Sequence, residues 1–243
     1  MELVPTDAPG ESDIVLTIQR TSPVHGILSI DDSGLSETGS WQLSAGLGID
    51  NPFYANDYLQ VDLNGDGMAD GYKRGTRGTQ LYYRIPYGKE TFSISYSHYK
   101  YHQTVSNTPY DFISSGKSNI SMVSWEHLIS RNQHRKTNFD VSLRKRDSHY
   151  YINDLEIPVQ TLHTTALEIG LSQQLYHGED MWYGRLAHRM GLGWFGAMPE
   201  NTYEDGPKTR YHMWLLDMDY RHAFTMGHRP AAYTSSLHGQ WTA

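Results

Sequence analysis

Apolar and polar positions alternate along most of this chain. Between Trp41 and Ile49 every second residue is apolar, and the residues between them are glycine, serine or glutamine. The same alternation recurs in Phe92–Ser97, Phe139–Arg144 and Leu167–Ser172. A period of two places alternate side chains on opposite faces of a β-strand. These segments therefore predict strands with one apolar and one polar face, and no stretch carries a convincing helical stripe.

About eleven such segments follow one another, each bounded by turn-forming residues. Pro86–Lys89 and Tyr176–Asp180 represent a compact group of connections, whereas Gln103–Lys117 and Gly193–Lys208 represent a long group rich in Gly, Asn, Asp and Pro. Short turns at one end and long loops at the other are typical of outer-membrane barrels. The pattern predicts an all-β, antiparallel transmembrane β-barrel, with a soluble all-β domain as the alternative. The segment centres are predicted near Leu28, Leu43, Val61, Leu81, Ile94, Met122, Val141, Ile169, Leu186, Leu216 and Leu237.

Composition narrows the function classes. The net charge is -7 and the isoelectric point is near 6.0, so we expect no nucleic-acid partner. Mean hydropathy is -0.60, and no apolar run approaches the ~18 residues of a membrane helix. A barrel strand exposes only every second residue to lipid, so its mean hydropathy can be low. These values therefore exclude membrane-spanning helices but not a membrane-spanning barrel. The chain contains no cysteine, and its 18 tyrosines suit strands that end at a wet boundary.

The start of the chain has a different pattern. Residues Met1–Asp7 have neither the basic patch nor the apolar core of a signal peptide, so we expect the chain to begin inside a longer protein. Ser12–Gln19 is predicted to form a short strand, preceded by Pro5 and Pro9. We interpret this strand as the last one of a small domain before the barrel.

The charged residues on the predicted polar faces are candidates for a pore lining. Mixed charge would keep a lumen hydrated, whereas Arg or Lys facing lipid at the midplane costs about 2–4 kcal/mol. The alternative is that some of these residues lie at loop bases, paired and structural. The pore-lining candidates are Arg84, Asp140, Arg144, Glu168, Arg185, Arg189, Asp217 and Asp219.

Tryptophans near predicted strand ends suggest an aromatic girdle at the membrane boundary. The girdle candidates are Trp41, Trp182 and Trp241, with ordinary core packing as the alternative. Trp214 lies in the middle of a predicted strand, so core or lipid contact fits it better.

No pattern for catalysis or metal binding stands out. Asp62–Gly67 resembles the start of a calcium loop, but position 12 is Lys73 rather than Glu, so a polar loop is the better interpretation. The histidines form no zinc-type cluster, and no nucleophile elbow or phosphate-binding loop occurs. Asp147, Ser148 and His149 are adjacent in a predicted strand, which sends them to alternate faces. We therefore expect no enzyme activity, no metal and no cofactor.

Several short motifs occur in order between Gly10 and Trp241. They are Gly10–Val15, Asp31–Gly34 with Thr38–Gly39, Asp50–Phe53 with Asn56–Asp57, Ile85–Gly88, Tyr101–Val105, Arg135–Thr137 and Asp154–Ile157. Together they resemble the two-partner secretion transporters of the haemolysin-activator type. In that family, Gly10–Val15 resembles the final strand of the second polypeptide-transport-associated (POTRA) domain, and Ile85–Gly88 resembles a periplasmic turn.

The resemblance implies a barrel of roughly 16 strands, preceded by two periplasmic POTRA domains. It implies an outer-membrane transporter that secretes and activates one large exoprotein, such as a haemolysin, an adhesin or a contact-dependent inhibition toxin. The expected partners are that exoprotein and outer-membrane lipid. A passive porin or a barrel enzyme is the alternative, and a porin would lack the POTRA-like strand.

The chain departs from the family, since it lacks the first POTRA domain, most of the second, and both motifs of the family's arginine–acidic pair. The family's Val-Arg-Gly motif of the sixth extracellular loop is absent, and Gln240–Ala243 resembles the strand just before that loop. The expectation is an internal fragment, with 1–22 as the remnant of the second POTRA domain and 23–243 as the N-terminal two-thirds of the barrel. No residue of this sequence takes the role of the family's arginine.

Overall fold

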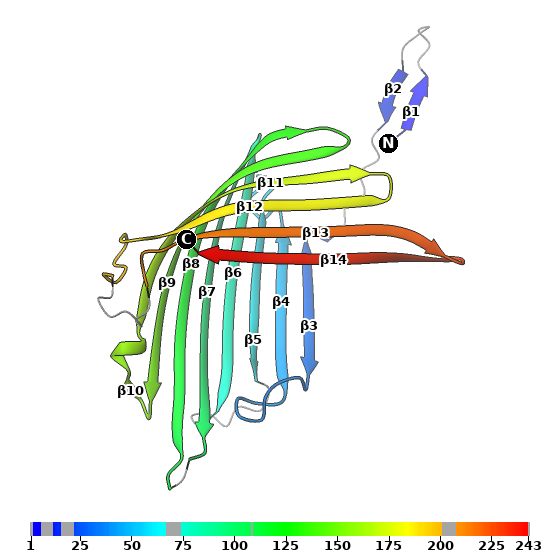
Figure 1. Ribbon diagram of the computed structural model, residues 1–243. Helices are drawn as coiled ribbons and strands as arrows, with labels where there is room; N and C mark the ends of the chain where they lie inside the picture. The colour runs from blue at the N-terminus through cyan, green and yellow to red at the C-terminus, as the bar shows by residue number, and fades with distance from the viewer. Residues whose placement is uncertain are drawn as a thin grey trace.

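A single large antiparallel sheet dominates the computed structural model (Figure 1). The structure describes residues 2–5, 12–15, 22–66, 74–107, 109–200 and 208–242. In these ranges the one helical element is a short 3-10 turn, η1 (Pro158–Gln160). No helix among the described residues has the length and apolar character needed to cross a membrane.

The sheet has twelve strands, and eleven of them follow one path in which sequence neighbours pair. The order is β14-β13-β12-β11-β9-β8-β7-β6-β5-β4-β3, and β10 (Leu155–Glu156) folds back onto β9. Every predicted segment centre lies inside one of the eleven path strands, so the predicted all-β fold is confirmed. The path strands are β3 (Val24–Asp31), β4 (Gln42–Asp50), β5 (Tyr58–Asp66), β6 (Gly75–Tyr87), β7 (Glu90–Val105), β8 (Phe112–Arg131), β9 (Arg135–Ile152), β11 (Leu162–His177), β12 (Asp180–Leu192), β13 (His212–Met226) and β14 (Arg229–Thr242).

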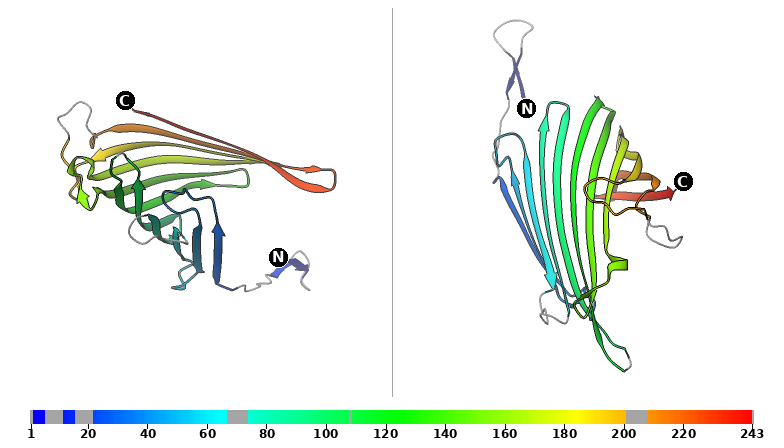
Figure 2. Two further views of the ribbon diagram at one scale, coloured as in Figure 1. Left: turned by 90° about the horizontal axis from the view of Figure 1, so that it is seen from below. Right: turned by 90° about the vertical axis from the view of Figure 1, so that its left-hand side faces the viewer.

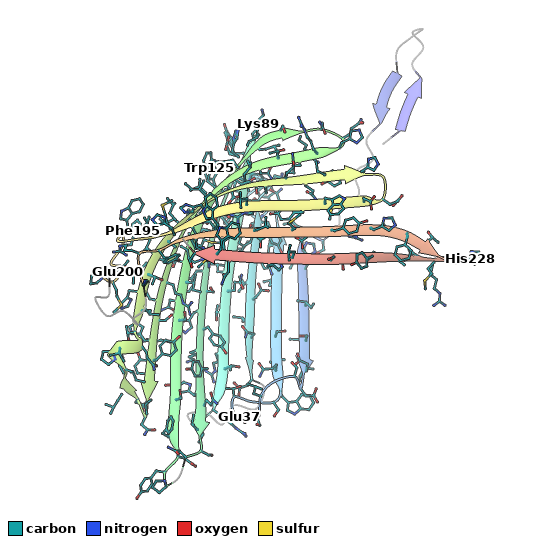
Figure 3. The ribbon with its side chains drawn as sticks, in the orientation of Figure 1. Glu37, Lys89, Trp125, Phe195, Glu200 and His228 are labelled. Carbon is teal, nitrogen blue, oxygen red and sulfur yellow. The ribbon has the colours of Figure 1, made fainter. Side chains whose placement is uncertain are left out.

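The compact connections gather at one end of the sheet and the longer ones at the other, as predicted, with the exception that 51–57 is one residue longer than 106–111. At one end of the sheet they span 51–57, 88–89, 132–134, 178–179 and 227–228, and at the other 32–41, 67–74, 106–111, 153–161 and 193–211. Figure 3 shows Glu37, from a long connection, and Lys89, from a short one, at opposite ends of the strands. Tight turns are possible at Gly88, Gly178 and Gly227 because each has a positive φ. We call these the short-turn end and the long-loop end.

The sheet has almost no hydrophobic core of its own. Among the described residues, only Ala166 and Ala187 are buried hydrophobics. Large apolar side chains are exposed instead, including Leu28 at 74%, Val123 at 56% and Leu237 at 58%. A contiguous apolar surface of this kind in water would aggregate, so the face that carries it must meet lipid or another apolar medium.

The sheet is coiled rather than flat. Strands β12–β14 run across the direction of β3–β5 (Figures 1 and 2), as the right-handed twist of neighbouring strands accumulates. The path ends at β3 on one side and β14 on the other, and these two strands do not pair with each other. Within the described residues the sheet is therefore open.

The N-terminal strands form a separate small sheet. Strand β1 (Glu2–Pro5) pairs antiparallel with β2 (Ser12–Val15), and neither joins the large sheet. The strand predicted over Ser12–Gln19 is present at Ser12–Val15, and residues 16–19 lie outside the described residues. Its partner β1 was not predicted, because four residues starting at Glu2 are too few to reveal a period.

Candidate functional site

Strand register places all eight predicted pore-lining residues on one face. Residues directly opposite each other on antiparallel strands point to the same side of the sheet. Glu168 faces Arg189, and Arg185 faces Asp217. The pairings of the intervening residues put Arg84, Asp140, Arg144 and Asp219 on this same face. We call it the polar face, and its lining is mostly serine, glycine, tyrosine and charged residues.

The centre of the polar face is an ion-pair network around Arg185. Its Nε and Nη2 donate to Asp140 Oδ1 and Oδ2 at 3.1 and 2.5 Å, and Nη2 also donates to Glu168 Oε1 at 2.7 Å. Arg189 donates to Glu168 Oε2 at 2.7 Å, and Asp217 lies 4.0 Å from Arg185 Nη1. These charged groups are largely removed from solvent, with 17% of the Arg185 side chain and 12% of the Glu168 side chain exposed. The network therefore holds three strands, β9, β11 and β12, through side chains as well as through backbone ladders.

A glycine makes the longest of these contacts possible. Asp140 and Arg185 lie on β9 and β12, which are separated by β11, and Gly170 of β11 lies directly opposite Asp140. A Cβ atom at Gly170 would lie 2.7 Å from both Arg185 Nη2 and Asp140 Oδ1. The missing side chain thus leaves the space through which Arg185 reaches across a whole strand.

The polar face is the concave one. A single hollow of about 380 Å³ is lined by residues of β6, β7, β8, β9, β11 and β12, which requires the sheet to curve around it. The hollow brings Arg84, Asp140 and Arg185 together, and Lys136 pairs with Glu126 at its edge at 3.8 Å. The other candidates lie further along the same face.

The remaining candidates have local partners. Arg144 Nη2 lies 3.8 Å from Met122 Sδ on the neighbouring strand. Asp217 also contacts His238 Nδ1 at 2.9 Å, and Asp219 accepts a hydrogen bond from Ser236 at 2.6 Å. The sequence therefore placed all eight residues on one face, but it did not indicate the pairing around Arg185 or the part played by Gly170. A glycine directly opposite Asp140 would have been the signal, but the register that pairs Gly170 with Asp140 cannot be derived from the sequence alone.

The three girdle candidates lie near strand ends. Trp182 is close to the start of β12 at the short-turn end, and its ring lies 4.2 Å from that of Tyr220. Trp241 is close to the end of β14 and stacks on Trp214 at 6.5 Å, while Trp41 directly precedes β4. All three are more than 40% exposed. Their role in a girdle stays a prediction.

One short connection is locked by an aspartate. Asp57 is 3% exposed and closes the connection 51–57, in which Asn51, Tyr54 and Asn56 have positive φ. Burial raises the pKa of the Asp57 carboxyl. Hydrogen bonds from Tyr83 Oη at 3.0 Å and from the backbone N–H groups of Phe53 and Ala55 outweigh burial, so the net pKa is lowered. The ionised carboxylate thus holds the turn in place between β4 and β5.

The structure explains the calcium-like motif and the adjacent residues Asp147 and Ser148. Asp62, Asn64 and Asp66 are alternate residues of strand β5, not a loop, and the rest of the calcium-like motif lies outside the described residues. No group of three metal-type ligands occurs in the part of the chain that the structure describes. Ser148 lies on the polar face, where its hydroxyl meets Ser118 and Arg146, while Asp147 pairs with His163 on the opposite face. Asp147 and Ser148 therefore do not assemble into a catalytic set.

An antiparallel sheet with an apolar convex face, a charged concave face and loops sorted by length defines the class of outer-membrane β-barrel proteins. Residues 10–243 match the family described as haemolysin secretion/activation protein ShlB/FhaC/HecB. The chain belongs to this family of outer-membrane proteins.

Individual relatives agree with the family match. The chain is 35% identical over 244 residues to outer membrane transporter CdiB-2 of Burkholderia pseudomallei (strain 1026b), covering 100% of this chain and 42% of that protein. It is 25% identical over 247 residues to hemolysin transporter protein HpmB of Proteus mirabilis, covering 100% of this chain and 43% of that protein. The chain thus spans less than half the length of these relatives.

Solved structures give the same fold. CdiB from Escherichia coli superposes with a TM-score of 0.89 at 24% identity, covering 99% of this chain and 44% of that one. CdiB from Acinetobacter baumannii superposes with a TM-score of 0.78 at 28% identity, covering 99% and 43%.

Proposed function

We propose that this chain forms barrel wall in an outer-membrane transporter that secretes and activates one large partner exoprotein by two-partner secretion. The observation that carries the proposal is the continuous polar face, which runs from β3 to β14 opposite an apolar face. Relatives named as CdiB and as a hemolysin transporter support the same activity. A haemolysin, an adhesin or a contact-dependent inhibition toxin is the class of cargo we expect.

The chemistry of the polar face suits the passage of an unfolded chain. Ser93, Ser95 and Ser97 follow one another along the polar side of β7, where they bind water and offer little apolar surface. The charges around Arg185 are paired with one another, so they hydrate the face and present little free charge to a cargo. The eight predicted residues would line the passage on this proposal, and Trp41, Trp182 and Trp241 would mark the membrane boundary.

The proposal includes a division of the chain. We assign 1–22 to the end of a periplasmic POTRA domain and 23–243 to the barrel. The separate β1–β2 sheet supports this boundary. We also assign the protein to transport rather than catalysis, since its family consists of transporters and Ser148 faces away from Asp147.

Site-specific crosslinking tests the proposal. The chain has no cysteine, so single cysteines can be introduced without background. Ser95→Cys and Ser142→Cys would place a thiol on the polar face, while the adjacent Ile94→Cys and Leu143→Cys would place one on the apolar face. Each variant carries a thiol-reactive crosslinker in cells that secrete the exoprotein, and the exoprotein is stalled in transit by a folded C-terminal fusion.

The expected result is crosslinking of the exoprotein to the thiols at positions 95 and 142 and not to those at the matched apolar-face positions. Equal crosslinking from both faces, or none from the polar face while secretion continues, would contradict a passage along this surface. As a control, deletion of the transporter gene should abolish secretion, which verifies that this exoprotein depends on this transporter.

A further inference from the structure

Three cations form a row across the apolar side of the sheet. Arg77 on β6 lies directly opposite Lys100 on β7, which lies directly opposite Lys117 on β8. By strand alternation they share the outer face with Leu81, not the polar face. Lys100 lies five residues before the end of β7 and Lys117 five residues after the start of β8, so the row is near the long-loop end.

This outer row forms no ion pair in the part of the chain that the structure describes. Like charges directly opposite each other on neighbouring strands destabilise a sheet. Among the described residues, no carboxylate forms an ion pair with Arg77, Lys100 or Lys117, although the network on the polar face is closely paired. The nearby Glu156 is hydrogen-bonded by His149 and Thr161. An anion from outside the protein that binds these three cations would offset their mutual repulsion.

The row borders a hollow that could receive such an anion. The hollow has a volume of about 220 Å³ and is lined by Lys100 and Lys117 together with His102, Tyr151, Ser115 and Asp154. Lys117 Nζ lies 5.4 Å from the Tyr151 ring centroid, which holds the ammonium toward the outer surface. Asp154 is the one acidic side chain in this lining, so the balance of charge remains positive.

The outer face changes character in steps along the strands. In the direction of the long-loop end, the first of three outward-facing rows contains Leu81 and Tyr96 and is apolar. The next outward-facing row contains His98 and Asn119, whose side chains lie 2.6 Å apart, and the cation row follows it. Leu81 and Arg77 are four residues apart, about 13 Å along a strand. A phosphorylated glycolipid presents matching groups in the same order: acyl chains, then amide and hydroxyl groups, then phosphates.

We propose that Arg77, Lys100 and Lys117 bind the phosphorylated headgroup of an outer-leaflet glycolipid, the lipid A part of lipopolysaccharide. The cations contact its phosphates, His98 and Asn119 hydrogen-bond its linkage region, and the apolar rows below contact its acyl chains. The proposal rests on the outer-membrane location of the family and is independent of secretion. A free phosphate would use the cations alone and would gain nothing from the two rows beneath them.

Lipid binding by the purified protein tests this assignment. The transporter of which this chain forms barrel wall is extracted from outer membranes, freed of lipid in detergent and titrated with bisphosphorylated lipid A under native mass spectrometry. Dephosphorylated lipid A and inorganic phosphate are the comparison ligands. The wild type should bind bisphosphorylated lipid A at least tenfold more tightly than the dephosphorylated form, and millimolar inorganic phosphate should not displace it. Equal binding of both lipids, or displacement by inorganic phosphate, would overturn the proposal.

Substitutions locate the site. The triple variant Arg77→Gln, Lys100→Gln, Lys117→Gln should lose affinity by on the order of 100-fold, at about fivefold per cation. The variant Arg77→Lys, Lys100→Arg, Lys117→Arg keeps the charge and should keep most of the affinity. A matched control removes three cations near the short-turn end, at Lys89, Arg131 and Arg229.

The control triple should bind lipid A like the wild type. An unchanged affinity in the first triple variant, or an equal loss in the control, would overturn the assignment. Heat-modifiable electrophoretic mobility verifies that each variant is folded. If the glutamine triple does not fold, the comparison of phosphorylated and dephosphorylated lipid on the wild type still decides the question. Secretion of the exoprotein is measured in parallel, so the two proposals can fail separately.

Discussion

Individual residues on the polar face differ in how much the fold depends on them. Arg185 donates to Asp140 and Glu168 at once, so Arg185→Gln leaves Asp140 without its two charged hydrogen bonds and Glu168 with Arg189 alone. We expect the free energy of unfolding to fall by about 1.5–3 kcal/mol, the range for hydrogen bonds to charged groups. The measurement is urea titration of the protein in outer-membrane vesicles, followed by tryptophan fluorescence.

Arg84 provides the matched control for Arg185. It lies on the same face and lines the same hollow, but it is exposed and forms no ion pair among the described residues. Arg84→Gln should therefore change stability by no more than about 0.5 kcal/mol. If the two substitutions cost the same, the network around Arg185 contributes nothing specific to the fold.

The Asp57 turn is expected to respond to acid. Its pKa is lowered in the folded protein, so its contribution is complete above the unfolded pKa and is lost as the pH falls through the folded pKa. Hydrogen exchange of the amides of Phe53 and Ala55 should therefore accelerate below about pH 4 beyond its intrinsic rate. Asp57→Asn should remove this extra acid dependence, and Tyr83→Phe should reduce it. An identical acid response in Asp57→Asn would assign the effect to another group.

At the scale of the strand, the alternation of faces makes a sharp prediction. Val123 and Ser124 are adjacent in β8 and lie on opposite faces. Val123→Arg would put a cation on the lipid side, at a cost of about 2–4 kcal/mol near the midplane, whereas Ser124→Arg would put it on the wet side. We expect the folded, heat-modifiable fraction in the outer membrane to drop for the first variant and stay near wild type for the second. The reverse order would mean that the apolar face is not the lipid face.

The strands were predictable because each is long enough to show its period. All eleven path strands have at least eight residues, and the predicted centres fall within them. Strand β10 and the η1 turn were expected only as a long loop, because two and three residues contain no measurable periodicity. The alternation likewise fixed which side chains share a face.

The partners within a face could not be predicted in the same way. The contact between Arg185 and Asp140 depends on the register of two ladders and on the open space at Gly170. Register follows from turn geometry, and the connection between β9 and β11 contains the unpredicted β10. The outer row of Arg77, Lys100 and Lys117 was missed for the same reason, since these residues are widely separated in sequence and meet only in register.

At the scale of the whole molecule, the two free edges decide how the chain behaves when it is expressed by itself. Strands β3 and β14 end the path, and every residue of β3 is exposed. An antiparallel path with an odd number of strands leaves its two edges pointing the same way. Closure of one copy would therefore need a parallel pair, whereas bacterial single-chain barrels have even strand numbers. Two copies can instead join like edges antiparallel, and unpaired edges favour such association.

Expressed alone and refolded in detergent, residues 1–243 should therefore form dimers and larger species joined edge to edge. The absence of native cysteine allows a direct test with Ser29→Cys in β3 and Ser236→Cys in β14. With a short thiol crosslinker, each single variant should give covalent dimers, because like edges meet. The double variant should give the same dimers and no internally crosslinked monomer, and Ser95→Cys in the central strand β7 should give neither. A monodisperse, heat-modifiable monomer with an internal crosslink between positions 29 and 236 would mean that eleven strands close on themselves, and the parallel seam would then have to be part of the fold.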